Sequence, residues 1–367
     1  MKLPDSTDAM ADLRMQKGQD NMQTKPLLGI TMGDPAGIGP EIIVKALSLE
    51  EIYAVCRPLV IGDYPVMQDA SEHITGLRLK LRRLDAKTAD RTGIEYGTID
   101  VLDLANVDLQ KLEHGKVSAM GGRACYQYIE KAIQLALEGE LDGTVTGPIH
   151  KEALNEAGYS YSGHTEIYAD LTHTKEYAMM LVTGSFRVVH VSTHVSLREA
   201  VDRVKRQRVL EVINLAYATL RRLGSENPRI GVAGLNPHAS DGGLFGNEEQ
   251  LEITPAIEQA RAAGLHVDGP LPPDTCFAKT RGGQYDIAVA MYHDQGHIPM
   301  KMVGFIWNEA EKRWSSVTGV NVTLGLPIVR TSVDHGVAFG KAGRGTASAE
   351  SLVAAIHVAR DLVGCQR

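Results

Sequence analysis

The chain has 367 residues, 43% of them apolar and 23% charged, with a formal net charge of -7 and a pI near 6.0. This composition is that of a globular protein long enough to form two lobes around a cleft. The acidic balance argues against nucleic acid and anionic membranes as partners, and no segment approaches the ~20 apolar residues of a membrane span.

The first 25 residues are polar and contain no apolar run of the kind that a signal peptide requires, so residues 1–25 are expected to form a flexible tail. The four cysteines are far apart and have no C-x-x-C spacing, which predicts unpaired thiols and a cytoplasmic location. They are Cys56, Cys125, Cys276 and Cys365.

From Pro26 onward, apolar runs of strand length alternate with segments of helical periodicity. This alternation predicts an α/β protein with a mainly parallel sheet. The predicted strands are PLLGITM, RPLVIGD, GTVTGPI, FRVVHVS, RIGVAGLN, DIAVAMY and VNVTLGLPIV. Two of the predicted helices place apolar residues on one face: Cys125, Ile129, Ala132, Ile133 and Ala136 in one, and Val209, Val212, Ile213, Ala216 and Leu220 in the other.

A glycine-rich loop, GDPAGIGPE, follows the first predicted strand, with Gly33, Gly37 and Gly39 ahead of a helix that opens at Pro40. Backbone N–H groups in such a turn can hold an anion. A tight connection between strand and helix explains the same residues equally well.

A second polar loop, SGHTE at residues 162–166, places Ser162, His164 and Thr165 before a helix. Hydroxyl groups and an imidazole suit a hydrogen-bonded oxyanion. Capping of the helix by Ser or Thr is the alternative.

Three histidines follow predicted strands: His194, His238 and His293. Three neutral imidazoles with an open fourth position make a site for a catalytic divalent ion such as zinc, although each one alone is more often an ordinary hydrogen-bonded histidine. Asp274 and Asp294 are candidates to fix the histidine tautomers, or alternatively to cap helices.

A third group contains two cations and an amide: Lys301, Asn321 and Arg330. Cations in apolar surroundings are rare unless they meet an anion, which favours a bound phosphate or carboxylate. An internal salt bridge is the alternative.

These segments together, GDPAGIGPEI, SGHTE, STHVSL, GLNPHA, LPPDT, YHDQG, VNVTLGLP and RTSVDHG, resemble the 4-hydroxythreonine-4-phosphate dehydrogenase family from about Pro26 to the C-terminus. The resemblance implies an isocitrate/isopropylmalate dehydrogenase-like fold, with two α/β/α lobes around a cleft, in a cytoplasmic homodimer. We expect one lobe to comprise residues 26–140 and 265–367, and the central lobe residues 141–264.

The resemblance also implies roles for individual residues. His194, His238 and His293 match the ligands of a divalent metal (zinc, cobalt or magnesium), with one histidine supplied by the partner subunit. The matching substrate contacts are His164, Thr165, Lys301, Asn321 and Arg330. The implied reaction is NAD-dependent oxidation of an alcohol β to a carboxylate in a small phosphorylated acid, followed by loss of carbon dioxide. Asp294 and Lys301 are the candidate catalytic side chains, with a metal-bound water as the other possible proton acceptor.

Three features depart from the family pattern. HDQGHIPMK, with His297 and Ile298, is more similar to the branch that oxidises D-threonate or D-erythronate 4-phosphate than to the pyridoxal phosphate branch. IWNEAEKRWSSVTG predicts a protruding hairpin at residues 306–319, either a cover for the cleft or a surface or dimer contact. In the cofactor loop DHGVAFGKAG, with Asp334, His335 and Gly336, the residues Gly340 and Lys341 replace the family's acidic and aliphatic residues, so NADP is expected to be tolerated beside NAD.

Other functions compatible with these residues are oxidation of an unphosphorylated cis-dihydrodiol carboxylate and, in a different class, phosphate acyl transfer. The three histidines argue against the acyltransferase, which does not require them. A non-catalytic metabolite-binding protein is disfavoured by the number of metal-capable, cationic and cofactor-loop residues in one chain.

Overall fold

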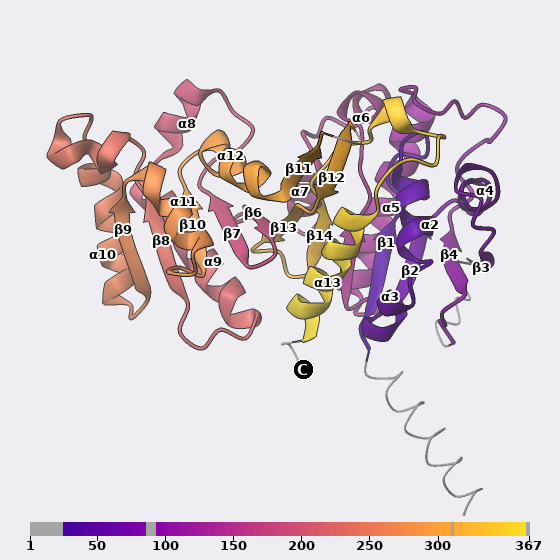
Figure 1. Cartoon of the computed structure of the whole chain (residues 1–367), viewed down its shortest axis with the longest axis horizontal. Coiled ribbons are helices and arrows are strands. Elements are labelled where there is room, and N and C mark those ends of the chain that lie inside the picture. The colour runs from indigo at the N-terminus through magenta and orange to yellow at the C-terminus, as the bar shows by residue number, and fades with distance from the viewer. Residues whose placement is uncertain (1–24, 86–92, 310–311, 365–367) are drawn as a thin grey trace, which may run out of the picture.

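The computed structural model describes residues 25–85, 93–309 and 312–364. The predicted tail lies outside the described residues, apart from its last residue, Lys25. One sheet of twelve strands runs through the molecule in the order β3-β4-β2-β1-β5-β14-β13-β6-β7-β10-β8-β9. Helices flank this sheet (Figure 1), so the predicted α/β class is confirmed.

The strands of the large sheet are mostly short and buried, as parallel strands covered on both faces should be. They are β1 (Leu27–Thr31), β2 (Arg57–Gly62), β3 (Lys80–Asp85), β4 (Thr98–Asp103), β5 (Gly143–Thr146), β6 (Ala178–Thr183), β7 (Phe186–His190), β8 (Arg229–Ala233), β9 (His266–Leu271), β10 (Ile287–Ala290), β13 (Val320–Leu324) and β14 (Arg330–Val333).

Most neighbouring strands pair in parallel, as predicted, and the exceptions lie in the middle of the sheet. There β13 pairs antiparallel with both β14 and β6, and β6 pairs antiparallel with β7. Only Gly184 and Ser185 join β6 to β7, and Gly184 has a φ of 58°. A two-residue link with positive φ can make only a hairpin, which explains the reversal.

The longer helices pack their apolar faces on the sheet. The two faces predicted from the sequence are buried in α5 (Ala119–Leu137) and α9 (Arg206–Arg222). The other α-helices are α2 (Gly39–Ala46), α3 (Glu50–Val55), α4 (Tyr64–Asp69), α6 (Lys151–Glu156), α7 (His164–Leu171), α8 (Leu197–Arg203), α10 (Thr254–Ala262), α11 (Pro273–Arg281), α12 (His293–Gly304) and α13 (Glu350–Gly364). Within the described ranges, no helix combines the length and apolar character that a membrane span requires.

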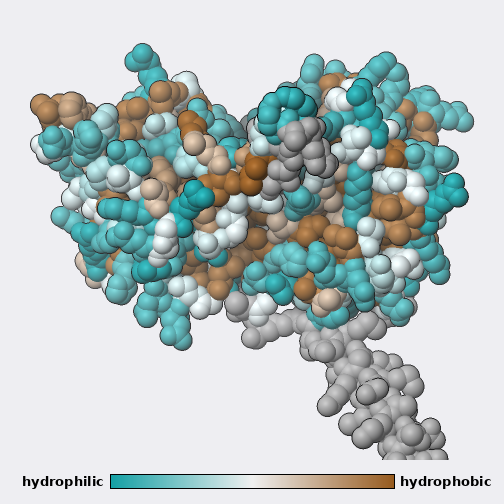
Figure 2. All heavy atoms as spheres, in the orientation of Figure 1, coloured by the Kyte–Doolittle hydropathy of each residue, from teal (hydrophilic) through white to brown (hydrophobic). Residues whose placement is uncertain are grey.

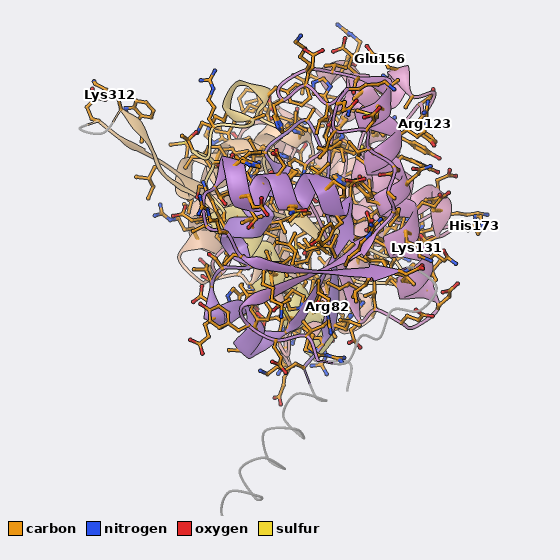
Figure 3. All side chains as sticks on the ribbon, turned by 90° about the vertical axis from the view of Figure 1, so that its right-hand side faces the viewer. Arg82, Arg123, Lys131, Glu156, His173 and Lys312 are labelled. Atoms are coloured by element: carbon orange, nitrogen blue, oxygen red, sulfur yellow. The ribbon has the colours of Figure 1, made fainter. Side chains whose placement is uncertain are left out.

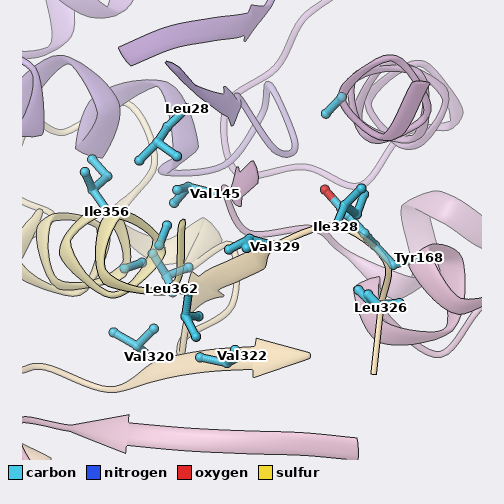
Figure 4. Close-up of a cluster of buried hydrophobic side chains, with 14 of the residues drawn as sticks. Leu28, Val145, Tyr168, Val320, Val322, Leu326, Ile328, Val329, Ile356 and Leu362 are labelled. Carbon is cyan, nitrogen blue, oxygen red and sulfur yellow. The ribbon is translucent and has the colours of Figure 1, made fainter. Parts of the chain in front are cut away.

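The C-terminal segment of the chain lies between its two halves. β13 and β14 separate β5 from β6 in the sheet, and α13 packs against β5, β13 and β14. Figure 4 shows the resulting cluster, in which Leu28 and Val145 from the first half gather with Val320, Ile356 and Leu362 from the C-terminal segment. All five are at most 4% exposed. The chain therefore closes its core by bringing the C-terminus back against β1 and β5.

The sheet has one half built from β1 to β5 and another built from β6 to β10 (Figure 1). The division into two lobes predicted from the sequence stays a proposal. The strand order would place residues 143–146 with the first half, and residues 266–290 with the second.

The glycine-rich loop after β1 is a tight connection. A Cβ atom on Gly39 would collide with the carbonyl oxygen of Met32, and Gly33 has a φ of 76°. The Ile38 amide donates to the Val337 carbonyl at 3.1 Å, so the loop also supports the segment that follows β14.

The predicted hairpin is confirmed. β11 (Phe305–Asn308) pairs antiparallel with β12 (Arg313–Val317), as a separate two-stranded sheet. Residues 310–311 of its turn lie outside the described residues. Figure 3 shows the hairpin standing out from the body of the molecule, with Lys312 near its tip.

The contact between α5 and α6 depends on a glycine, which gives a test of the packing. A Cβ atom on Gly122 would collide with the carbonyl of Ala153. Gly122→Ala is therefore expected to lower the free energy of unfolding by about 1–3 kcal/mol, measured by urea denaturation. Gly364→Ala is the control, because a Cβ atom there would meet no atom of the described residues within 4 Å. Equal stability of the two variants would contradict this account of the α5–α6 contact.

Candidate active site

The three candidate metal histidines follow three neighbouring strands. β10 lies between β7 and β8 and pairs in parallel with both. Because the carboxyl ends of parallel strands share one edge of a sheet, the loops that carry His194, His238 and His293 leave from the same edge. Each histidine follows the carboxyl end of one of these three strands, so the strand order brings their loops to the same edge of the sheet.

Two of the three histidines meet. The ring centroids of His194 and His293 are 5.7 Å apart. His293 Nδ1 is 2.6 Å from Asp294 Oδ1, the distance expected of a partner that fixes the histidine tautomer. His194 Nδ1 lies 3.9 Å from Glu166 Oε1, an ion-pair distance. Each imidazole thus faces an oxygen through Nδ1, which leaves Nε2 as the atom available to a cation.

His238 does not join them. It belongs to the segment Pro237–Gly243, and its ring lies 6.4 Å from the ring of Phe245. His238 to Asp241 have φ values between 46° and 66°, a backbone conformation that is more typical of functional loops than of ordinary turns. Within the described part of the chain, no three His, Cys, Asp or Glu side chains are placed to hold a metal together. Asp274, the other predicted tautomer partner, lies in the first turn of α11.

A cavity of about 280 Å³ lies beside His194 and collects most of the predicted substrate residues. It opens among β13, β14, α7 and the loop after β14. The predicted residues that line it are His164, Thr165, His194, Asn321, Arg330, Asp334, His335 and Gly336.

Arg330 is the only cation on this cavity, among the described residues, that is fully buried; it is 2% exposed. Its guanidinium donates to the hydroxyls of Thr323 and Thr146, both at 3.0 Å, and packs 5.6 Å from the Tyr168 ring. Burial lowers the pKa of Arg330 to about 10, so it remains charged at neutral pH. No carboxylate forms an ion pair with it within the described residues, and its Nε has no hydrogen-bond partner there.

Three further polar atoms in this cavity are buried without a partner within the described residues: His164 Nε2, Asn321 Oδ1 and Glu166 Oε2. Burial and the neighbouring Arg330 charge hold the pKa of His164 well below its usual range, so its ring is neutral. Thr165 Oγ1 lies 3.4 Å from Thr323 Oγ1, beside the Arg330 contact. Unpaired buried polar atoms are costly, so this group is arranged for a ligand.

Lys301 forms the internal salt bridge that the sequence left open as the alternative to a bound anion. Its Nζ forms an ion pair with the Asp334 carboxylate and donates to the Asp334 carbonyl at 3.0 Å. It also lies 4.5 Å from the ring centroid of Phe305. Lys301 therefore connects α12 to the predicted cofactor loop, and Asp334 stands between Lys301 and the cavity.

The predicted cofactor loop has free space around two of its glycines. A Cβ atom on Gly336 or Gly340 would meet no atom of the described residues within 4 Å, and neither glycine has a positive φ. Burial lowers the pKa of His335, whose Nδ1 lies 3.0 Å from the Gly336 carbonyl. Lys341 is exposed at the end of a short 3₁₀ turn and has no ion-pair partner in the described ranges.

A family model described as "Pyridoxal phosphate biosynthetic protein PdxA" matches residues 54–359. The chain belongs to the PdxA family. Its curated relatives include the D-threonate 4-phosphate dehydrogenase of Cupriavidus necator, 46% identical over 92% of this chain and 97% of the relative. The enzyme of the same name from Salmonella typhimurium is 46% identical over 93% of this chain and 100% of the relative.

Solved structures agree with this assignment. The 4-hydroxythreonine-4-phosphate dehydrogenase from Klebsiella pneumoniae matches with a TM-score of 0.79 and 42% identity, covering 92% of this chain and 98% of that one. A terephthalate 1,2-cis-dihydrodiol dehydrogenase from Burkholderia xenovorans matches less closely, with a TM-score of 0.63 and 28% identity over 92% of this chain and 98% of that one. This PdxA-family protein is therefore an oxidoreductase, and the alternative of an acyltransferase is set aside.

Sequence reasoning missed two functional candidates in this PdxA-family site. His190 ends β7 and lies 4.8 Å, centroid to centroid, from His297 on α12. His297 in turn stacks on His293 at 3.6 Å. The spacing of His293 and His297, four residues apart on a helix, was the signal that could have shown that they share a face.

Proposed function

We propose that this enzyme oxidises D-threonate 4-phosphate, or a closely similar sugar-acid phosphate, with a nicotinamide cofactor and a divalent cation. The observation that carries the proposal is Arg330, a buried cation without a carboxylate partner in the described residues, on a cavity that also holds the unpaired atoms of His164 and Asn321. A phosphate or carboxylate would satisfy the Arg330 charge in charge-assisted hydrogen bonds.

The choice of substrate rests on the relatives. Those at 46–47% identity over more than nine-tenths of this chain carry the name D-threonate 4-phosphate dehydrogenase. The resemblance of HDQGHIPMK to that branch points the same way. We therefore place D-threonate 4-phosphate ahead of 4-hydroxythreonine 4-phosphate, and ahead of a cis-dihydrodiol acid, whose dehydrogenase is only 28% identical to this chain.

In this proposal His194 and His293 hold the divalent cation, zinc, cobalt or magnesium, together with His238 of the partner subunit. The residues fit such an ion, because His194 and His293 each face a carboxylate through Nδ1. A bound cation would polarise the substrate hydroxyl as a Lewis acid. His238 is assigned to the partner because the family resemblance implies that one of the three histidines comes from the partner subunit, and because the described residues of one chain hold no group of three metal-capable side chains.

The surface beside this site suits a second copy of the chain. Apolar side chains gather over α12 and the start of β11 (Figure 2), where Met302 is 78% exposed and Ile298 58% exposed. A groove of about 450 Å³ continues this surface past Phe277 and Asp294. Exposed apolar patches of this kind mark protein–protein contacts, so we propose a homodimer through this face. The free, buried thiols of Cys56, Cys125 and Cys276 favour the cytoplasm; Cys365 lies outside the described residues.

In this proposal different side chains of the enzyme bind the substrate and handle its proton. Arg330 and His164 hold and orient the anionic substrate, so that its alcohol carbon faces the nicotinamide. Oxidation of an alcohol β to the carboxylate would give a β-keto acid, which loses carbon dioxide. Asp334 lines the cavity and forms an ion pair with Lys301, so in this proposal it is the candidate to accept the proton of the substrate hydroxyl. Asp294 contacts His293 instead.

The cofactor loop supports use of NADP as well as NAD. Gly340 and Lys341 provide no carboxylate to repel a 2′-phosphate, and Lys341 carries an exposed charge. Lys341→Glu is expected to lower kcat/KM with NADP by about tenfold or more relative to NAD, because it replaces attraction by repulsion. Lys279→Glu, on α11, is the matched charge reversal. An unchanged cofactor ratio in Lys341→Glu would remove Lys341 from the cofactor site.

The proposal is tested by measuring NAD(P)H formation with cobalt- or zinc-loaded enzyme and three substrates: D-threonate 4-phosphate, D-erythronate 4-phosphate and 4-hydroxythreonine 4-phosphate. We expect the highest kcat/KM with D-threonate 4-phosphate. Preference for 4-hydroxythreonine 4-phosphate would place the enzyme in pyridoxal phosphate synthesis instead. An unphosphorylated cis-dihydrodiol acid is assayed beside them, and turnover of that compound alone would overturn the proposed role of phosphate.

A further inference from the structure

The proposed substrate carries two anionic groups, and a single buried cation can hold only one of them. D-threonate 4-phosphate has a carboxylate at one end of its carbon chain and a phosphate at the other. Arg330 pairs with one of these groups in the proposed function. Lys301 does not supply the other charge, because its Nζ is already paired with the Asp334 carboxylate. The second anionic group therefore needs another partner.

A second cation, Lys151, lines the same cavity of about 280 Å³ as Arg330. Among the described residues, these two are the only lysine or arginine side chains on that cavity. Lys151 is exposed, and its ammonium group forms no ion pair within the described part of the chain. The remaining acid on the cavity, Glu166, faces His194 at 3.9 Å. We propose that Lys151 binds the anionic group of the substrate that Arg330 does not hold, an inference that rests on the proposed function.

The two cations reach the cavity from neighbouring strands. Arg330 begins β14, which pairs in parallel with β5. Its guanidinium donates to the hydroxyl of Thr146, the last residue of β5, at 3.0 Å. Lys151 lies one short loop further along the chain, where α6 begins. The carboxyl end of β5 thus brings both charges to one cavity, at the edge of the sheet where ligands bind in folds of this kind.

The loop that carries Lys151 is held in place by the glycine-rich segment GDPAGIGPE and by the end of β1. The Gly147 amide donates to the Thr31 carbonyl at 3.0 Å, and a Cβ atom on Gly147 would collide with the same oxygen. The Asp34 amide donates to the Pro148 carbonyl at 2.9 Å. The glycine-rich segment, which the proposed function leaves without a role, therefore fixes the backbone from which Lys151 extends.

The place of Lys151 in its helix also favours binding over stability. Lys151 is the first residue of α6, and a cation is unfavourable at the N-terminal end of a helix, where free amides carry partial positive charge. The fold therefore gains nothing from this charge, and its removal should leave the melting temperature unchanged or slightly raised. A bound anion beside Lys151 would make the same charge favourable.

The test is a calorimetric titration of the cobalt- or zinc-loaded, full-length enzyme with D-threonate 4-phosphate in the absence of NAD(P), with steady-state kinetics in parallel. Lys151→Met is expected to raise Kd and KM for the acid by about tenfold or more, the effect of losing a contact between charged groups. Because Lys151 is exposed, the difference from the wild type should shrink at high salt. KM for the cofactor should not change, which distinguishes the substrate from the cofactor diphosphate as the bound anion.

Two further variants serve as controls. Lys151→Arg keeps the charge and should restore most of the affinity. Lys111→Met removes an exposed lysine that pairs with Asp108 and does not line the cavity, so it should match the wild type.

The possible failures are distinct. If the wild type oxidises D-threonate 4-phosphate and Lys151→Met keeps the wild-type Kd and KM, Lys151 does not bind the substrate and the proposed function stands. If Lys151→Met raises only KM for the cofactor, Lys151 contacts the cofactor and the inference is wrong. If the wild type prefers 4-hydroxythreonine 4-phosphate, which carries the same two anionic groups, the titration with that compound decides the role of Lys151. If the wild type binds no phosphorylated acid, both the inference and the proposed function are wrong.

Discussion

Arg330→Met is expected to lower kcat/KM for the phosphorylated acid by about a thousandfold without destabilising the fold. Hydrogen bonds to charged groups contribute about 1.5–3 kcal/mol each, so losing two to a substrate anion would remove roughly 3–6 kcal/mol of binding in the transition state. The variant also loses the hydrogen bonds from Arg330 to the Thr323 and Thr146 hydroxyls, and the removal of a buried charge offsets that loss. Arg330 is buried without a carboxylate partner in the described residues, and replacing a buried charge by an apolar side chain is often neutral or stabilising.

The two effects are measured together, as steady-state kinetics and as a melting temperature. Arg187→Met is the control: Arg187 is a partly buried arginine on β7, away from the cavity, and it donates to the carbonyls of Ser185 and Asp286. That variant should keep its kcat/KM and lose stability, the opposite pattern. Arg330→Lys, which keeps the charge but not the planar fork, should lie between wild type and Arg330→Met. Arg330→Met with wild-type kcat/KM would show that the anion binds elsewhere.

Much of the fold follows from local patterns. Apolar strands and one-sided helices fix an α/β protein, and the polar residues after FRVVHVS and DIAVAMY mark the edge where ligands bind. His194 and His293 meet because β7 and β10 are neighbours, a fact that sequence spacing indicated only indirectly. The hairpin could be predicted from two short apolar flanks around a charged turn, because strand pairing there is entirely local.

The features that the sequence did not predict depend on contacts between segments far apart in the chain. The sequence pattern missed β6, because AMMLVT reads as either helix or strand until the two-residue link to β7 fixes it. For Lys301 the sequence left a bound anion and an internal salt bridge open, because its partner Asp334 lies 33 residues away, in the loop after β14. His190 resembles an ordinary strand residue, and only the packing of α12 on β7 brings it to His297.

His238→Ala is expected to abolish turnover, by about a thousandfold or more, through loss of a ligand that comes from the partner subunit. Because the proposed site is shared between two subunits, a pair of inactive variants gives a sharper experiment than the single variant. A second inactive variant, His293→Ala, loses a ligand on the other side of the same shared site. Neither homodimer contains a complete site, so each variant alone should be inactive.

Mixing the two variants under conditions that exchange subunits should restore activity. Half of the dimers in an equal mixture are heterodimers, and each heterodimer has one site with all its histidines and one with two missing. Activity should therefore recover to about a quarter of the wild type. A mixture of His194→Ala and His293→Ala is the control, because both residues belong to the same side of the site and no heterodimer is complete. If the His238→Ala and His293→Ala mixture stays as inactive as this control, His238 acts within its own chain or not at all, and the shared site is wrong.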